Sequence, residues 1–324
     1  MKTGQNSQNF LKTYCSRHHL IITQEIARGW SADKKYLAVS WTGEKFLLRT
    51  THAKEKFPHK QQEFAALKTL EKLGLPVPKA IDLTCGSNGE TICMLLSWIP
   101  GQDLADVIQN LPPEEQYRLG IAAGKILRQL HTIPAPDEIP RWEEWFSQKM
   151  DRRTKAYTAS GIRLPHDEKI LAYITANRHL IRNRPQCFQH GDYHIGNMVL
   201  NEDGTFGIID FDRTDYGDPW EEFNRITWCR AASAYFAAGR IDGYFDGEIP
   251  EKFWKLCLLY ICSDMIGAAA AAVSLGENEV TGVMQTARDV FSWFNEETDA
   301  DNPVPDWYRS ARINIKNFWN RAKN

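Results

Sequence analysis

Before position 98, apolar residues stand mostly in short runs rather than at helical spacing. Short apolar runs are typical of β-strands, and they predict strands in four segments: 20–22, 36–41, 45–50 and 91–97. Residues 61–73 differ, because Phe64, Leu67, Leu70 and Leu73 recur every third residue before Gly74. This spacing predicts a helix that ends at the glycine. A leading helix is expected ahead of the first strand.

Beyond the Pro100-Gly101 break the pattern becomes helical. Apolar positions at helical spacing, with proline-rich links between them, predict helices in six segments: 114–131, 141–183 (two helices with a break near 160–161), 220–238, 251–275, 279–294 and 307–322. Residues 256–275 are apolar enough to raise the question of a membrane span, but they include Ser263 and Asp264, which favours a buried helix. The fold class expected is α+β, with a sheet-rich part at 1–98 and a mostly helical part at 99–324.

A short hairpin carries the clearest candidate chemistry. Two apolar runs, 198–200 and 206–209, flank an Asn-Glu-Asp-Gly turn. Asn197 precedes the first strand and Asp210 ends the second, so antiparallel pairing brings the two together. An amide and a carboxylate oxygen suit Mg²⁺, with phosphate oxygens and water completing its shell. Asp192, five residues before Asn197, is placed to accept a proton from an incoming hydroxyl.

Each of these residues alone is an ordinary loop former, but the ordered set is specific. The set comprises HGDYHIGN from His190, IIDFD from Ile208 and GDPW from Gly217. It resembles the aminoglycoside phosphotransferase and choline kinase-like family of small-molecule kinases. The resemblance implies a two-lobed, protein-kinase-like fold that binds ATP and Mg²⁺, with Asp192 as the catalytic residue and Asn197 and Asp210 as metal ligands.

The resemblance also implies where the nucleotide binds. The loop from Gly29 to Ser31 would cover the phosphates, although Gly29 alone is a common turn residue. Arg49 stands where the family has a phosphate-binding lysine, a departure that keeps the charge. Glu63 would pair with that cation; a solvated helix glutamate is the alternative. Backbone groups of Ser97 and Ile99 would hold adenine, with the choice between ATP and GTP left open.

The spacing of the last two motifs limits the acceptor. Only six residues separate Phe211 from Asp218, which leaves no room for the activation loop of a protein kinase. The acceptor is therefore expected to be a small molecule, such as an aminoglycoside-like antibiotic, an amino alcohol or a sugar. Asp212 is expected to cap the following turn. Five aromatic residues form either a cation–π box for an amine or, more commonly, core: Trp220, Trp228, Tyr244, Phe245 and Trp254.

Other candidate residues are assigned to structure. His190 and His194 are expected to hydrogen-bond within their loop. Asp218 is expected to accept backbone N–H groups.

Composition limits the partners and the cellular compartment to be expected for the protein. A net charge of −2 without a basic block gives no reason to expect nucleic acid or a membrane as partner. The seven cysteines form no C-x-x-C pair, and the N-terminus does not resemble a signal peptide, so reduced thiols in the cytoplasm are expected. The oligomeric state is left open. The alternative function is a nucleotide-binding pseudokinase scaffold without transfer activity. The departures from the family pattern at Arg49 and Asp212 leave this alternative open.

Overall fold

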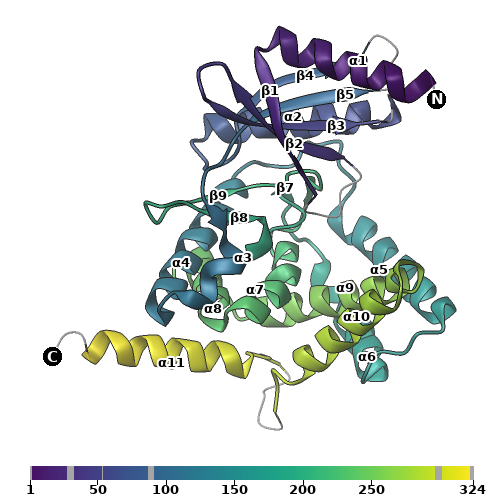
Figure 1. Cartoon of the computed structure of the whole chain (residues 1–324). Coiled ribbons are helices and arrows are strands. Elements are labelled where there is room, and N and C mark those ends of the chain that lie inside the picture. The colour runs from purple at the N-terminus through teal and green to yellow at the C-terminus, as the bar shows by residue number, and fades with distance from the viewer. Residues whose placement is uncertain (1, 28–32, 53, 87–90, 296–300, 322–324) are drawn as a thin grey trace. The chain divides into compact units, whose positions relative to one another are not determined.

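The computed structural model describes residues 2–27, 33–52, 54–86, 91–295 and 301–321 (Figure 1). The chain divides into two compact units, each considered by itself. The first comprises Met1–Asp103 with Asn197–Thr214, and the second comprises Leu104–Gly196 with Asp215–Asn324. The domain boundary at 98/99 expected from the sequence stays a prediction.

The first unit is built on an antiparallel sheet of five strands in the order β1-β2-β3-β5-β4. The strands are β1 (Leu20–Ile26), β2 (Lys34–Ser40), β3 (Lys45–Thr51), β4 (Ala80–Cys85) and β5 (Ile92–Ser97). Helix α1 (Lys2–Arg17) contributes Tyr14 and Cys15 to a core cluster that also contains Leu48 of β3. Because successive side chains of a strand point to opposite faces, Arg49 faces away from that cluster. On its side of the sheet it meets helix α2 (Phe57–Lys72).

A three-stranded sheet completes the first unit, in the order β6-β8-β9. It consists of β6 (Gln102–Asp103), β8 (Met198–Leu200) and β9 (Phe206–Ile208). The predicted hairpin is formed by β8 and β9, with Met198 opposite Ile208. Gly204 in its turn has a φ of 78°, which glycine adopts without steric cost. Pairing of Gln102 with Leu200 and a hydrogen bond from Ile208 N–H to the Pro76 carbonyl (2.8 Å) attach the hairpin to the rest of the unit.

The second unit is mostly helical. Its α-helices are α3 (Leu104–Val107), α4 (Pro113–Leu130), α5 (Trp142–Ser160), α6 (Asp167–Asn177), α7 (Ile226–Ala232), α8 (Ala234–Phe245), α9 (Phe253–Leu275), α10 (Glu277–Phe291) and α11 (Asp306–Arg321). Its shorter 3-10 turns are η2 (Ile108–Asn110), η3 (Arg178–Ile181) and η5 (Glu221–Arg225). A further turn, η1 (Lys54–Lys56), lies within the first unit, and η4 (Ile195–Asn197) ends where the chain returns to that unit. Strands β7 (Cys187–Gln189) and β10 (Asp215–Gly217) pair antiparallel.

Most of the helices agree with the sequence pattern, including the break after α5, where Gly161 has a φ of 75°. The predicted helix at 220–238 is wrong in detail: it is divided into η5, α7 and α8. The division between α7 and α8 falls at Ser233, which is extended and whose hydroxyl accepts the Phe236 N–H. A serine at this position caps the next helix rather than continuing the previous one.

Helices α4 and α8 cross at very short range. A Cβ atom on Gly120 would lie 2.2 Å from the Phe236 carbonyl oxygen, and one on Gly243 would lie 2.2 Å from the Ile121 carbonyl oxygen. No side chain fits at those separations, so glycine is required at both positions for the helix backbones to touch.

Helix α9 passes through the interior of the second unit. Among the described residues it is the helix long and apolar enough to cross a bilayer, and 61% of its most apolar window is buried inside the fold. It packs on α5, α6 and α10. The core helix of a folded domain satisfies the same criteria of length and composition. The sequence likewise favours a buried helix for this segment.

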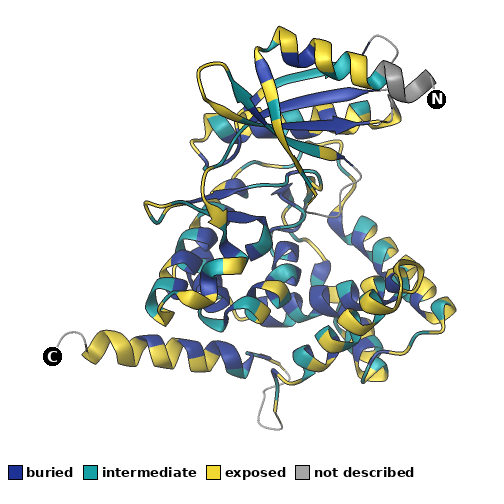
Figure 2. Ribbon diagram, viewed as in Figure 1, coloured by how far each residue is buried: buried dark blue, intermediate teal, exposed yellow. Residues whose placement is uncertain are grey.

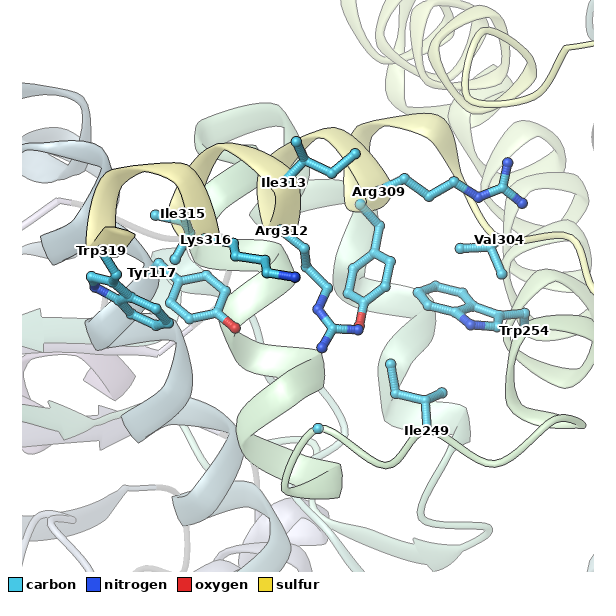
Figure 3. A pocket seen from close by; sticks show the side chains of 12 residues that line it. Tyr117, Ile249, Trp254, Val304, Arg309, Arg312, Ile313, Ile315, Lys316 and Trp319 are labelled. Atoms are coloured by element: carbon cyan, nitrogen blue, oxygen red, sulfur yellow. The ribbon is translucent and has the colours of Figure 1, made fainter. Parts of the chain in front are cut away.

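Helix α11 is attached to the second unit through a buried carboxylate. Trp307, Tyr308, Ala311 and Ile315 are its buried residues, and much of the rest is exposed (Figure 2). Asp242 of α8, 3% exposed, accepts hydrogen bonds of 2.5 Å from the hydroxyls of Tyr117 and Tyr308, and it pairs with Arg312 Nε at 3.1 Å. Tyr117, Tyr308 and Arg312 all line the groove beside α11, and Figure 3 shows Tyr117 and Arg312 there.

Replacing Asp242 by alanine is expected to destabilise the protein by about 3 kcal/mol, because it leaves buried hydroxyls and a guanidinium without their acceptor. The free energy of unfolding in urea measures this change. Asp246→Asn is the matched control: this carboxylate pairs with Arg128 but is 60% exposed, so loss of its charge should leave the unfolding midpoint unchanged. Asparagine also tolerates the left-handed backbone at this position, where φ is 52°. Equal midpoints for the Asp242 variant and the wild type would contradict the assigned role.

Candidate active site

The hairpin brings the two predicted metal ligands together. Ile209 N–H donates to the Asn197 carbonyl at 3.0 Å, directly beyond the Met198–Ile208 pair. Asn197 is 9% exposed and Asp210 is half-buried. Asp210 has a φ of 66°, a left-handed conformation that aspartate tolerates better than most residues. An amide and a carboxylate, both hard oxygen donors, therefore flank the open end of one hairpin and fit a magnesium ion by the chemistry of the pair.

Five ionisable side chains form what we call the charged cluster, on the face of the five-stranded sheet opposite the core cluster that contains Leu48. Its members are Asp33, Arg49, Lys60, Glu63 and Asp212. Arg49 pairs with Glu63 and, at 2.8 Å, with Asp33. Lys60 Nζ lies 2.7 Å from Asp33 and 3.2 Å from Glu63. Asp212 pairs with Lys60 and lies 3.4 Å from Arg49. Asp212 is the most exposed member, at 31%.

The two cations of the charged cluster, together with Asp33 and Asp212, are expected to be ionised at neutral pH. Burial alone would lower the pKa of Arg49, but the carboxylates of Glu63, Asp33, Asp212 and Asp210 outweigh it and the pKa is raised. Burial and Arg49 would also lower the pKa of Lys60, but its carboxylate partners raise it. Three carboxylates thus face two cations, and the cluster is negatively charged overall.

Sequence reasoning missed Lys60 and Asp33. The buried face of α2 consists of Lys60, Glu63, Leu67 and Leu70. The apolar spacing in the sequence includes Leu67 and Leu70 but has Phe64 and Leu73 in place of the two charged residues. Leu73 is 39% exposed and lies beyond the helix end. The signal for Lys60 was its position one helical turn before Glu63 on the face that carries Leu67 and Leu70.

The turn-capping role expected for Asp212 is wrong. Its carboxylate pairs with Lys60 and Arg49 instead, so it belongs to the charged cluster. Burial would raise its pKa, but hydrogen bonding to Lys60 and the charges of Lys60 and Arg49 lower it.

The other predicted nucleotide contacts differ in their placement. Gly29 and Ser31 lie outside the described residues. Ser97 ends β5, where its N–H donates to the Lys79 carbonyl at 2.9 Å and its hydroxyl accepts the Lys79 N–H at 2.8 Å. The side chain of Ile99 lies against Gly207 of β9. The Ser97 N–H is therefore used within the sheet, and the adenine contacts expected of the Ser97 and Ile99 backbones stay predictions.

Asp192 belongs to the second unit, where a buried carboxylate holds its loop. Glu222, 1% exposed, accepts the N–H groups of His190 at 3.0 Å and Gly191 at 2.7 Å. Burial would raise the pKa of Glu222, but His131 and His190 lower it. The Asp192 N–H in turn donates to His190 Nδ1 at 3.2 Å. These bonds fix the backbone on both sides of Gly191.

The side chain of Asp192 is 19% exposed and ion-paired. Arg225 Nε lies 2.9 Å from Asp192 Oδ1, and His194 Nε2 lies 3.6 Å from Oδ2. His194 Nδ1 accepts the Gly196 N–H at 3.0 Å, so both histidines bond within their loop, as the sequence predicts. Arg225 was not anticipated, because it comes from η5, more than thirty residues further along the chain.

Asp218 is a structural carboxylate, in agreement with the sequence. It is fully buried and accepts the Trp220 N–H at 2.9 Å and the Tyr260 hydroxyl at 2.6 Å. Arg184 forms two further hydrogen bonds to it, at 2.6 and 2.9 Å.

The aromatic residues considered for a cation–π box do not form one. Trp220, Tyr244 and Phe245 pack with Phe223 and Phe253 in a core cluster, and the Arg184 guanidinium already lies 3.8 Å from the centre of the Trp220 ring. Trp254 lines the groove beside α11, a cavity of about 790 Å³ (Figure 3). Among the described residues, none of those predicted to bind metal or nucleotide or to act in catalysis lines that groove. Trp228 is separate, 55% exposed, and stacks on His194.

Replacing Arg49 by alanine is expected to destabilise the first unit by about 3–5 kcal/mol, because Asp33 and Glu63 would lose a buried partner. Arg49→Lys keeps the charge without the guanidinium fork, so a smaller loss is expected. Urea unfolding monitored by far-UV circular dichroism measures both. Lys34→Ala, an exposed substitution on the neighbouring strand, should have no effect. Wild-type stability of the alanine variant would contradict the assigned packing.

Stability is also expected to depend on pH through Asp33. Burial would raise the pKa of Asp33, but Lys60, Thr51 and Arg49 lower it from 3.8 to about 2. The ionised carboxylate therefore stabilises the folded protein by about 2 kcal/mol above pH 4, and this contribution is lost as the pH falls toward 2. Asp33→Asn should lower the unfolding free energy at pH 6. The difference from the wild type should shrink as the pH approaches 2; a difference independent of pH would refute the linkage.

The chain matches the model of one protein family and resembles several solved structures. Residues 22–254 match the model of the phosphotransferase enzyme family (APH). Among solved structures, the amicoumacin kinase hAmiN in complex with AMP-PNP, Ca²⁺ and Ami has a TM-score of 0.64 at 14% identity, covering 95% of this chain and 99% of that chain. The GDP and kanamycin complex of APH(2")-IIia has a TM-score of 0.65 at 15% identity, covering 87% and 97%.

Two further relatives extend the comparison. The macrolide 2'-phosphotransferase MphH from Brachybacterium faecium has a TM-score of 0.61 at 15% identity, covering 86% of this chain and 98% of that chain. Acyl-CoA dehydrogenase family member 10 of Mus musculus is 24% identical over 185 residues, which are 54% of this chain and 17% of that protein. The chain therefore spans only a small part of that curated relative.

The solved structures share the arrangement described above, an antiparallel five-stranded sheet followed by a largely helical region. The family match extends from β1 through the hairpin and its motifs to the start of α9. The chain belongs to the phosphotransferase enzyme family and has its kinase-like α+β fold.

Proposed function

We propose that this phosphotransferase transfers the γ-phosphate of ATP to a hydroxyl group of a small polar molecule. The observation that supports it most directly is the hairpin. The Ile209–Asn197 hydrogen bond and the left-handed backbone of Asp210 hold an amide and a carboxylate at one end of it. This pair, in a chain of the phosphotransferase family, has the donor chemistry needed at a Mg²⁺–phosphate site.

Asn197 and Asp210 would hold Mg²⁺. The bound metal would offset the negative charge of the phosphates and the further negative charge that develops during transfer. The protein's own cations near Asp210 are engaged, since Arg49 and Lys60 face three carboxylates in the charged cluster. Nucleotide binding is therefore expected to be weak without a divalent cation, because the cluster alone would repel the phosphates.

Asp192 would orient the acceptor hydroxyl. Arg225 Nε lies 2.9 Å from Oδ1 of this carboxylate as an ion pair, which favours the ionised form of Asp192 at this position. In the transfer the hydroxyl oxygen forms the new bond to the γ-phosphorus while the bond to the β-phosphate oxygen breaks. The hydroxyl proton passes to Asp192, and ADP and a phosphomonoester leave. Positioning and charge stabilisation supply most of the catalysis in such reactions.

The acceptor would be a small molecule that reaches the protein in the cytoplasm. The solved relatives include complexes with kanamycin and with Ami, and for this chain an aminoglycoside-like antibiotic, an amino alcohol and a sugar remain the classes to test. The nucleotides in those structures are AMP-PNP and GDP, so GTP is tested beside ATP.

One observation favours a nucleotide-binding scaffold as the second candidate. Arg49 is 4% exposed and Lys60 3%, and both are paired with carboxylates. An ion pair with the helix glutamate Glu63 is expected in a working kinase, but Asp33 and Asp212 also pair with these cations and compete with phosphate for them.

An ADP-release assay separates the two candidates. Purified protein is incubated with Mg²⁺ and ATP or GTP, together with a panel of hydroxyl-bearing antibiotics, amino alcohols and sugars. The proposal predicts acceptor-dependent ADP release that is lost in Asp192→Asn. Nucleotide binding by calorimetry without ADP release for any acceptor would favour the scaffold.

A further inference from the structure

Asp192 is one end of a chain of ion pairs on the second unit, which we call the ionic network. Arg225 bridges Asp192 and Asp264, with 2.9 Å to Asp192 Oδ1 and 3.1 Å to Asp264 Oδ2. Arg153 continues the chain, at 2.9 Å from Asp264 Oδ1. Its other guanidinium nitrogen donates to the buried Ser263 hydroxyl at 3.1 Å. The network thus joins the loop of Asp192 to η5, α9 and α5.

A second pair adjoins the network and completes it. Lys149 of α5 lies 3.2 Å from Glu221 of η5, and Glu221 contributes to the raised pKa of Arg225. Burial alone would lower the pKa of Arg225, but Asp264, Asp192, Glu221 and Glu222 raise it. Arg225 therefore stays charged across the physiological range and remains a fixed cation beside Asp192.

The ionic network is electrically balanced. Three carboxylates (Asp192, Glu221 and Asp264) are matched by three cations (Lys149, Arg153 and Arg225). The side chains are between 10% and 23% exposed, so the network is accessible to a ligand. Glu222 also lies near Arg225 but is buried and already holds the loop through His190 and Gly191.

Such a surface is unsuited to a polycation. A ligand with several ammonium groups is attracted by unpaired carboxylates. Here such a ligand would have to displace Arg225 or Arg153 from its carboxylate partner, or bind next to these guanidinium groups. Like charges placed together at a binding surface repel each other and weaken binding. Paired side chains can still exchange hydrogen bonds with neutral hydroxyl groups, since guanidinium groups donate and carboxylates accept.

An exposed aromatic face adjoins the network. Trp228 is 55% exposed, and its ring stacks on His194 with centroids 5.0 Å apart and planes at 29°. His194 also lies 3.6 Å from Asp192. An aromatic ring offers an apolar face against which the ring of a bound ligand can pack. The surroundings of Asp192 therefore combine hydroxyl-binding groups with a flat apolar surface, and the partly exposed carboxylates of the ionic network there are matched by cations.

We propose that the acceptor is an electrically neutral, sugar-like polyhydroxyl molecule, with one hydroxyl at Asp192 and a ring face against Trp228. This inference rests on the proposed function, since it assumes that the acceptor binds at Asp192. It narrows the acceptor classes by charge: neutral sugars are favoured over polycationic aminoglycosides.

Calorimetry tests the charge argument without requiring turnover. Kanamycin, a polycation, is titrated at low salt into wild-type protein and into the double variant Lys149→Gln/Arg153→Gln, which leaves Glu221 and Asp264 without these partners. The variant is expected to bind kanamycin at least about ten-fold more tightly than the wild type, and the gain should disappear at high salt. The matched control is Arg152→Gln/Lys155→Gln, which makes the same change in charge at exposed positions of α5 and should show no gain.

A panel of acceptors tests the sugar-like class. Neutral monosaccharides and disaccharides, their amino-sugar analogues and their uronic acids are compared by ADP release and by the change in fluorescence on binding, with Trp228→Ala as the reference. The neutral members should have the highest kcat/KM, independent of salt, and Trp228→Ala should raise their KM. Preference for amino sugars or uronic acids, salt-sensitive kanamycin binding by the wild type, or no binding of any neutral sugar would overturn the proposal.

The two proposals fail in different ways. A protein that releases ADP with a cationic acceptor retains the proposed function but refutes the neutral acceptor. A protein that binds neutral sugars but never releases ADP refutes the kinase activity instead.

Discussion

Replacing Asp210 by asparagine is expected to abolish phosphate transfer, a loss of at least about 10³-fold, while the protein stays folded. The substitution removes the only carboxylate of the proposed metal-ligand pair, and a metal's charge stabilisation is worth several kcal/mol in reactions of this kind. Asparagine also tolerates the left-handed backbone at this position, where φ is 66°. The hairpin should therefore keep its shape.

Steady-state ADP release as a function of Mg²⁺ concentration measures this effect. The matched control is Asp203→Asn in the turn of the same hairpin, where the exposed carboxylate accepts hydrogen bonds from Thr205. That variant should turn over like the wild type. Normal turnover and normal Mg²⁺ dependence of Asp210→Asn would remove Asp210 from the metal site.

The second large effect is expected for Asp192→Asn: a loss of turnover of roughly 10²-fold or more with nucleotide affinity nearly unchanged. The asparagine has almost the same shape and retains an oxygen that can face Arg225. It cannot take the hydroxyl proton, and it orients the acceptor less well. Because the loop is held by Glu222 through backbone N–H groups, its conformation should not depend on the Asp192 carboxylate.

Calorimetric titration with an ATP analogue and steady-state assays on the same variant decide this prediction. Loss of nucleotide binding would show that Asp192 is part of the metal or nucleotide site. Turnover at the wild-type rate would show that the reacting hydroxyl lies elsewhere. Asp218→Asn offers a contrast, since removing the charge from a fully buried group held by Arg184 should lower stability rather than turnover alone.

Short-range patterns explain which parts of the fold were predictable. The hairpin was predictable because its turn and apolar runs are local, and the Met198–Ile208 pairing follows from them. The pairing of Arg49 with Glu63 was implied by the family resemblance rather than by periodicity. The break between α5 and α6 was predictable from Gly161, whose φ is 75°.

Contacts between distant positions explain what the sequence could not provide. Asp33, Lys60 and Asp212 are brought together by strand pairing and helix packing, and no local pattern links their positions. Asp212 was expected to cap a turn because alternation along a strand was assumed past Asp210. The backbone there is left-handed, so the alternation does not continue. Arg225 was missed because it lies in a 3-10 turn far along the chain from Asp192, and such a turn has no strong apolar period.

The central claim is that the chain transfers phosphate to a hydroxyl group, and phosphorus-31 NMR of a reaction mixture tests it most directly. Protein, Mg²⁺ and ATP are incubated with the best acceptor from the ADP-release panel, with Asp192→Asn as the blank. A phosphomonoester resonance that grows in equal amount with ADP is the predicted result. ADP accompanied only by inorganic phosphate, or bound ATP that stays intact with every acceptor, would contradict it.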